Sequence, residues 1–300
     1  MNIATKLLKP SELPSSNILT IYGRGGTGKT TFSSSAPKPM FYMDIKDRGT
    51  DSIRDVDGID VLPIDDFDEI ELSYWYLKKK HRKYRTIVWD TISQAQDLAA
   101  YKLYEKRGIK FDSGSIGKWG TLRRQDFGDI AGQMKKWIIA YKDLAIEHNM
   151  VLIFIAHDRI FNFDEENDVD EEITPEVGPR VMPSVAATLN GNSSVVVNTF
   201  IRRHTERRRV KNKIKANTEL QYCMRVGPHE YYLTKMRKPK RVILPQVIID
   251  PTYDTLMGVT TSWQGGQPPR RRSRSSKSTS PASRAARRSG DGSAPTSRTR

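Results

Sequence analysis

The sequence predicts an α/β fold in which a central, mostly parallel sheet carries helices on both faces. Short apolar runs alternate with helix-length segments up to about residue 160. The run at 151–156 is apolar at every position, which is typical of a strand buried on both faces of a parallel sheet. The run at 18–22 ends at a glycine-rich loop that leads into a helix-like segment, the connection expected in such a sheet.

The apolar runs predict strands at 18–22, 40–43, 61–64, 86–89 and 151–156, and helices are predicted at 30–35, 67–80, 93–107 and 127–148. Beyond residue 160 the pattern becomes β-rich. Strands are expected there at 195–201, 220–226, 231–235 and 242–249. An acidic run from Asp164 to Glu172 precedes them and is expected to be a solvated loop.

The composition limits the possible functions. A chain of 300 residues is long enough to bury a core, and its net charge of +15 favours a polyanionic partner, with nucleic acid the first candidate. The single cysteine, Cys223, excludes an internal disulfide and a cysteine-based zinc site. We find no secretory leader at 1–16 and no apolar run long enough to span a bilayer, so we expect a cytoplasmic protein without membrane contact.

The last 37 residues, 264–300, form a basic tail rich in serine and arginine. They contain ten Lys or Arg residues against a single acid, Asp291, and no Val, Ile, Leu, Met, Phe, Trp or Tyr. A segment without apolar side chains cannot offset the entropy of folding, so we expect this tail to be disordered.

The glycine-rich loop carries a complete phosphate-binding motif, G-x-x-x-x-G-K-[ST]. Its glycines let backbone N–H groups converge on phosphates, Lys29 is expected as an exposed ligand of the β/γ oxygens, and Thr30 binds Mg²⁺ through its hydroxyl. The helix that follows points its positive end at the same phosphates. The motif therefore predicts a site for ATP and Mg²⁺, formed by Gly23, Arg24, Gly25, Gly26, Thr27, Gly28, Lys29, Thr30 and Thr31.

Asp90 is the candidate second metal ligand. It follows the strand predicted at 86–89, at the strand end where α/β sheets place ligand-binding groups. A carboxylate there holds Mg²⁺, usually through water. The alternative is that Asp90 only caps the next helix, near Ser93.

These motifs resemble the phage-encoded AAA-type ATP-binding proteins, which have a RecA/RadA-like core and include single-strand annealing recombinases of the Sak type. The resemblance covers roughly 17–250 and implies a RecA-like P-loop NTPase domain there, after an N-terminal extension at 1–16 and before a linker at 251–263. It is carried by Ile21 through Phe32, Ala36 to Pro39, Phe41 to Asp44, Thr86 to Ser93 and Ile153 to His157.

The resemblance implies further site residues. In RecA-related ATPases the strand between the two Walker strands carries a polar sensor at its tip, and His157 ends the matching strand; the alternative is a surface histidine that starts a loop. The family also has a catalytic acid two residues beyond the first Asp after its second strand, where this chain has Lys46. Asp47 is the nearest substitute, with Asp44 orienting it, unless both belong to a solvated loop.

RadA-like proteins also carry a Lys-x-Arg on a late strand that reaches the ATP of a neighbouring subunit. Lys235 and Arg237 have that spacing, which places both side chains on one face of a strand. The resemblance therefore implies a homo-oligomer with ATP at the subunit boundary. The alternative is an ordinary charged strand face.

A basic run from Arg202 to Lys215 is the candidate DNA-binding segment. It holds eight Lys or Arg residues and one Glu. In an extended hairpin its alternating lysines could follow the phosphates of single-stranded DNA, although charge runs are more often solvated loops. The tyrosines at 222, 231 and 232 could stack bases, but core packing is the expected use.

The motifs predict an ATP-binding and ATP-hydrolysing protein, the basic segments favour DNA as its partner, and the resemblance implies a role in phage recombination or replication. The alternative is a nucleotide-gated assembly protein with little turnover and no DNA substrate.

Overall fold

The computed structural model describes residues 7–9, 17–106, 123–161, 176–210 and 213–261. Most of the N-terminal extension, the acidic run 164–172 and the basic tail 264–300 lie outside these residues. No helix among the residues described is both long and apolar enough to cross a membrane.

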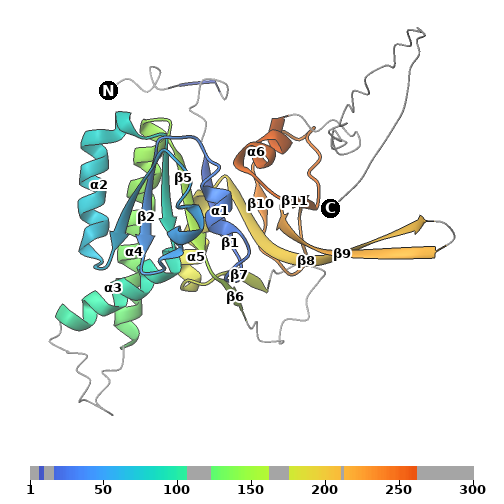
Figure 1. Cartoon of the computed structure of the whole chain (residues 1–300). Coiled ribbons are helices and arrows are strands. Elements are labelled where there is room, and N and C mark those ends of the chain that lie inside the picture. The colour runs from blue at the N-terminus through green and yellow to red at the C-terminus, as the bar shows by residue number, and fades with distance from the viewer. Residues whose placement is uncertain (1–6, 10–16, 107–122, 162–175, 211–212, 262–300) are drawn as a thin grey trace, which may run out of the picture. The chain divides into compact units, whose positions relative to one another are not determined.

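The described residues build a nine-stranded, mostly parallel sheet around which the helices pack (Figure 1). Its strand order is β11-β9-β8-β1-β5-β4-β2-β3, and β10 pairs with β8 off this path. The parallel part consists of β1 (Ile18–Tyr22), β2 (Met40–Ile45), β3 (Ile59–Ile64), β4 (Thr86–Asp90), β5 (Val151–Ala156) and the start of β8 (Val195–Val210). The antiparallel part adds β9 (Lys213–Arg225), β10 (Lys235–Met236) and β11 (Val247–Ile249).

Helices cover both faces of the sheet, as the apolar strands predict. One core joins the sheet to α2 (Asp68–Lys80), α3 (Ile92–Lys106), α4 (Arg124–Glu147) and α5 (Pro183–Asn192). The other core joins it to α1 (Lys29–Ser33), the 3₁₀ helix η3 (Gly49–Ile53) and α6 (Tyr253–Thr261). Alternate residues of β1 enter opposite cores, with Ile18 and Tyr22 in the first and Leu19 and Ile21 in the second, because successive strand side chains point to opposite faces.

The N-terminal half follows the predicted element order closely, and the C-terminal half departs from it. The strands expected at 195–201 and 220–226 are the inner ends of a much longer β8–β9 hairpin. The strand expected at 231–235 is reduced to β10 and an isolated bridge of Tyr232 to Val177, because the neighbouring β7 (Val177–Pro179) is only three residues long. The strand expected at 242–249 is reduced to β11, because Pro245 cannot donate to a strand ladder.

The linker expected at 251–263 contains helix α6 instead. Tyr253 and Leu256 of this helix are buried against the second core. The N–H of Tyr253 donates to Ser35 Oγ at 2.8 Å, which ties α6 to the end of α1. The described part of this segment, 251–261, therefore belongs to the folded domain.

Candidate nucleotide-binding site

The phosphate-binding loop connects β1 to α1 and packs directly against β8. A Cβ at Gly23 would stand 2.4 Å from the carbonyl oxygen of Thr199 and 2.6 Å from its Oγ1, so only glycine allows this approach. Thr27 Oγ1 lies 2.7 Å from Thr199 Oγ1 and donates to Arg24 O at 2.8 Å. The loop conformation is thus fixed both by its own hydrogen bonds and by the start of the hairpin.

Lys29 is buried, in contrast to the exposed ligand expected from the sequence. Its side chain is 7% exposed, and its Nζ donates to the carbonyl oxygens of Gly23 at 2.9 Å and Arg24 at 2.7 Å. Burial lowers the pKa of the Lys29 ammonium, while the nearby Asp90 and Asp47 oppose that effect. The lysine is held inside the loop by two carbonyl groups that phosphate oxygens can replace as acceptors.

Asp90 ends β4 beside Thr30, as predicted. Its Oδ2 accepts hydrogen bonds from Thr30 Oγ1 at 2.8 Å and from the Tyr42 hydroxyl. Burial raises the pKa of this carboxyl group to about 6, and the two hydrogen bonds and the Lys29 charge only partly offset the increase. A buried carboxylate whose negative charge is only partly compensated by its surroundings favours a bound cation.

Gly49, the first residue of η3, leaves open space next to Thr30 and Asp90. A Cβ built there would lie 3.5 Å from Thr30 Oγ1, 3.6 Å from Asp90 Oδ2 and 3.9 Å from Asp47 Oδ2. Hydroxyl and carboxylate oxygens suit Mg²⁺, which commonly takes one or two protein ligands and completes its shell with phosphate and water. The residues present therefore fit the metal expected at Thr30 and Asp90.

The structure separates the two carboxylates at the end of β2, Asp44 within the strand and Asp47 just after it. Asp47 lines the same cavity as Lys29 and Asp90. Asp44 is not among its lining residues: Asp44 Oδ2 accepts from Thr50 Oγ1 at 2.8 Å, and its buried Oδ1 has no partner among the residues described. Asp44 thus anchors η3, and Asp47 is the one of the two acids that lines the cavity.

His157 follows β5, which lies between β1 and β4 as the resemblance implies. Its backbone N–H donates to Ser93 Oγ at 3.1 Å, and its side chain lines the cavity. Burial, followed by the Lys29 charge, lowers the pKa of the imidazole, so it is neutral at pH 7. A neutral imidazole can donate a hydrogen bond to a phosphate oxygen.

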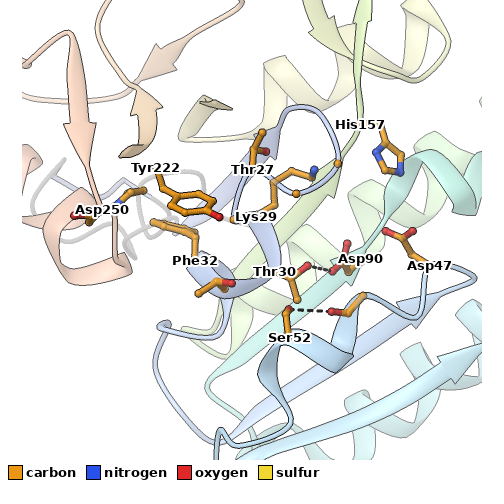
Figure 2. Close-up of a pocket in the computed structure, with 16 residues that line it drawn as sticks. Thr27, Lys29, Thr30, Phe32, Asp47, Ser52, Asp90, His157, Tyr222 and Asp250 are labelled. Carbon is orange, nitrogen blue, oxygen red and sulfur yellow. Dashed lines mark hydrogen bonds between the residues drawn. The ribbon is translucent and has the colours of Figure 1, made fainter. Parts of the chain in front are cut away.

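These residues surround a cavity of about 760 Å³, a size typical of a small-molecule site. Figure 2 shows Asp90, Asp47 and His157 on one side of Lys29, with Phe32, Tyr222 and Asp250 on the other. Sequence reasoning assigned Tyr222 mainly to core packing. It missed six residues that line this site: Phe32, Gly49, Ser52, Tyr222, Asp250 and Pro251. Tyr222 is instead 46% exposed at the cavity.

Lys235 and Arg237 lie away from this cavity in their own chain. β10 pairs with Val195 and Val196 at the start of β8, whereas the phosphate-binding loop follows the opposite end of β1. Arg237 Nη2 donates to Gly191 O at 2.8 Å, and Lys235 Nζ donates to Asn190 O. Both cations thus cap the C-terminal end of α5, and their role towards a neighbouring subunit stays a prediction.

The described residues of the basic run, 202–210 and 213–215, lie in β8 and β9, as the extended alternative predicts. Cross-strand pairing continues to Val210 and Lys213. In Figure 1 the hairpin projects from the sheet as a long arm. Near its base, Arg202 Nε donates to Gln221 Oε1 at 3.1 Å and Thr205 Oγ1 lies 3.0 Å from Thr218 Oγ1.

Comparison with known proteins agrees with this geometry. A search of curated proteins found no match. The scan of protein families found one whose description is "AAA domain", and it matches residues 15–238. The match spans well over half of the chain and includes the phosphate-binding loop, Asp90 and His157. By fold, site and family match, the chain belongs to the AAA domain family of P-loop proteins.

Proposed function

We propose that this protein is an ATP-hydrolysing P-loop ATPase with a RecA-like core that binds single-stranded DNA. The ATPase part rests on one observation: Lys29, Thr30, Asp90 and Asp47 converge on a single cavity at the carboxyl edge of the sheet. The position of β5 between β1 and β4 supports the RecA-like core. The resemblance extends the proposal to phage recombination or replication in the cytoplasm of a host cell, with single-strand annealing as one activity.

Each site residue has a distinct task in this proposal. Lys29 exchanges its carbonyl acceptors for β/γ-phosphate oxygens, and Thr30 and Asp90 hold Mg²⁺. The bound metal neutralises the charge of the phosphates. Asp47 orients the attacking water, and neutral His157 donates to the γ-phosphate. Burial of Lys29 and Asp90 keeps both groups in place before the nucleotide arrives.

The β8–β9 hairpin is the proposed DNA-binding element. The backbone is extended over 202–210 in β8 and over 213–215 in β9, so the described part of the basic run lies along two paired strands. The net charge of +15 adds long-range attraction for nucleic acid. Binding of this kind is electrostatic and falls steeply with salt.

A nucleotide-gated assembly protein with little turnover is the second candidate. The observation that favours it is Lys46, which occupies the place of the family's catalytic acid and pairs with Asp65 at 2.9 Å, outside the cavity. In that case nucleotide binding would assemble subunits, and DNA would play no part.

The ATPase rate with and without single-stranded DNA distinguishes the two candidates. We expect DNA to raise the rate severalfold and Mg·ATP to strengthen a DNA mobility shift, with affinity falling at least tenfold between about 50 and 200 mM salt. A chain ending at residue 263 should keep the ATP-dependent part of the shift, because it keeps the hairpin. An ATPase rate that is the same with and without DNA, together with no ATP-dependent DNA mobility shift, would favour the nucleotide-gated assembly protein.

A further inference from the structure

We propose that Tyr222 is the platform on which the base of the bound nucleotide stacks. The end of the β8–β9 hairpin nearest the sheet then forms the part of the nucleotide site that holds the nucleobase. This inference rests on the proposed nucleotide-binding function and goes beyond it, because the phosphate-binding motif says nothing about the base.

The position of Tyr222 matches the position of a base. Asp90, Asp47 and His157 mark the phosphate and metal end of the cavity, and Tyr222 lies beyond the other side of the loop (Figure 2). A Cβ built on Gly28 would lie 3.4 Å from Tyr222 Cδ1, so the ring stands beside the end of the loop, next to the position that Gly28 leaves without a side chain. A nucleotide with its phosphates in the loop must extend its base towards one side, and this side offers an aromatic ring.

Exposure distinguishes Tyr222 from the other aromatic residue in the cavity. Phe32 is 2% exposed and packs in the second core, so its ring has no free face for a ligand. Tyr222 is 46% exposed, and among the residues described its hydroxyl makes no hydrogen bond. An exposed aromatic ring in a cavity gains from covering its face with another flat ring.

The backbone around Tyr222 is fixed before any ligand binds. Tyr222 pairs with Ile201 of β8, and its carbonyl accepts the N–H of Asp250 at 2.8 Å at the end of β11. Asp250 and Pro251 line the same end of the cavity. Antiparallel partners on both sides of β9 hold Tyr222 in place, so little conformational freedom is lost when a base stacks on its ring.

Stacking explains base binding without a base-specific contact, because every base has a π-face and purines have the larger one. It also joins two parts of the molecule. The strand that carries Tyr222 continues as one side of the basic arm, so the nucleotide touches the DNA-binding element directly.

Binding of Mg·ATP and of Mg·tripolyphosphate, measured by calorimetry, tests the inference. Tripolyphosphate keeps the phosphates and lacks the base. Tyr222→Ala should weaken ATP binding about 5- to 150-fold, the range of aromatic stacking, and leave tripolyphosphate binding unchanged. Tyr222→Phe should bind ATP like the wild type. Leu220→Ala is the matched control, because Leu220 is 67% exposed on the same strand and does not line the cavity.

Each contrary result has its own meaning. If Tyr222→Ala binds ATP as tightly as the wild type, the base lies elsewhere and the inference is overturned. Equal losses for both ligands would overturn it too, because Tyr222 would then support the loop and not the base. If the wild type binds neither ligand, the proposed nucleotide site itself fails.

Discussion

Asp90 carries an electrostatic cost that nucleotide and metal binding can remove. Its buried carboxyl group has a pKa of about 6 against 3.8 for the free group, so the folded state holds the proton more tightly than the unfolded state. Ionised Asp90 therefore destabilises the free protein above pH 6, and this cost disappears as the pH falls towards 4. A bound cation would compensate the same charge.

Asp90→Asn should consequently stabilise the nucleotide-free protein at alkaline pH. The amide can keep an acceptor for Thr30 and Tyr42 while losing the buried charge, and a shift of about two pKa units corresponds to at most roughly 3 kcal/mol. Urea unfolding should show the gain at about pH 8 and almost none at about pH 4. Lower stability than the wild type at alkaline pH would mean that Lys29 already compensates the carboxylate.

Gly49 is predicted to keep space for the metal ion. Gly49→Ala places a methyl group 3.5 Å from Thr30 Oγ1 and 3.6 Å from Asp90 Oδ2, where an ion bound at about 2.1 Å from oxygen must fit. We expect the Mg²⁺ requirement for ATP turnover to rise about tenfold or more, with ATP binding in the absence of metal unchanged. Gly132→Ala is the control, because a Cβ there meets no atom within 4 Å. An unchanged Mg²⁺ titration would place the ion elsewhere.

The residues that the sequence predicted are those that a local pattern specifies. The motif from Gly23 to Thr30 is contiguous, and Asp90 and His157 each end an apolar run. Tyr222 and Gly49 show no such pattern, because their roles arise from contacts across the sheet. Tyr222 reaches Gly28 only because β8 pairs with β1 and β9 pairs with β8. The burial of Lys29 depends on how the loop folds, which the motif does not state.

At the scale of elements, apolar runs buried on both faces were predictable and irregular pairings were not. β1, β4 and β5 are fully buried, and their ends were placed to within a residue. The outer half of the hairpin is polar, so only cross-strand pairing identifies it as strand. Helix α6 is short, and among its residues 253–259 Tyr253 and Leu256 are the two that are buried, too weak a pattern to distinguish the helix from a linker.

Lys235 and Arg237 donate hydrogen bonds to carbonyl groups at the C-terminal end of α5, which is a structural role. This role is compatible with a second, catalytic role at the ATP site of a neighbouring subunit. Cations at the last carbonyl groups of a helix stabilise it by about 0.3–1 kcal/mol, so Arg237→Ala should lower the melting temperature slightly. We further expect Arg237→Ala and Lys29→Ala subunits to be inactive alone and to regain part of the DNA-stimulated ATPase when mixed. Full DNA-stimulated activity of Arg237→Ala alone would mean that Arg237 caps helix α5 and has no role in the ATP site of a neighbouring subunit.

At the scale of the whole molecule, strand β9 connects the proposed nucleotide site to the basic arm. The phosphate-binding loop packs on β8 at Thr199, and the proposed base platform lies on β9. In the proposed complex, β8 would therefore lie beside the phosphates and β9 beside the base of the nucleotide. Since the whole arrangement depends on a nucleotide in this cavity, the most informative measurement is binding itself.

That measurement is the affinity of the purified wild type and of Lys29→Ala for Mg·ATP, made by calorimetry well below both melting temperatures. Loss of Lys29 also removes the donor to Gly23 and Arg24, so circular dichroism must first establish that the variant is folded. We predict saturable, Mg²⁺-dependent binding by the wild type and a loss of at least tenfold in the folded variant, because charge-assisted hydrogen bonds to phosphate disappear. Equal affinity of the two proteins, or no binding by the wild type, would contradict the account.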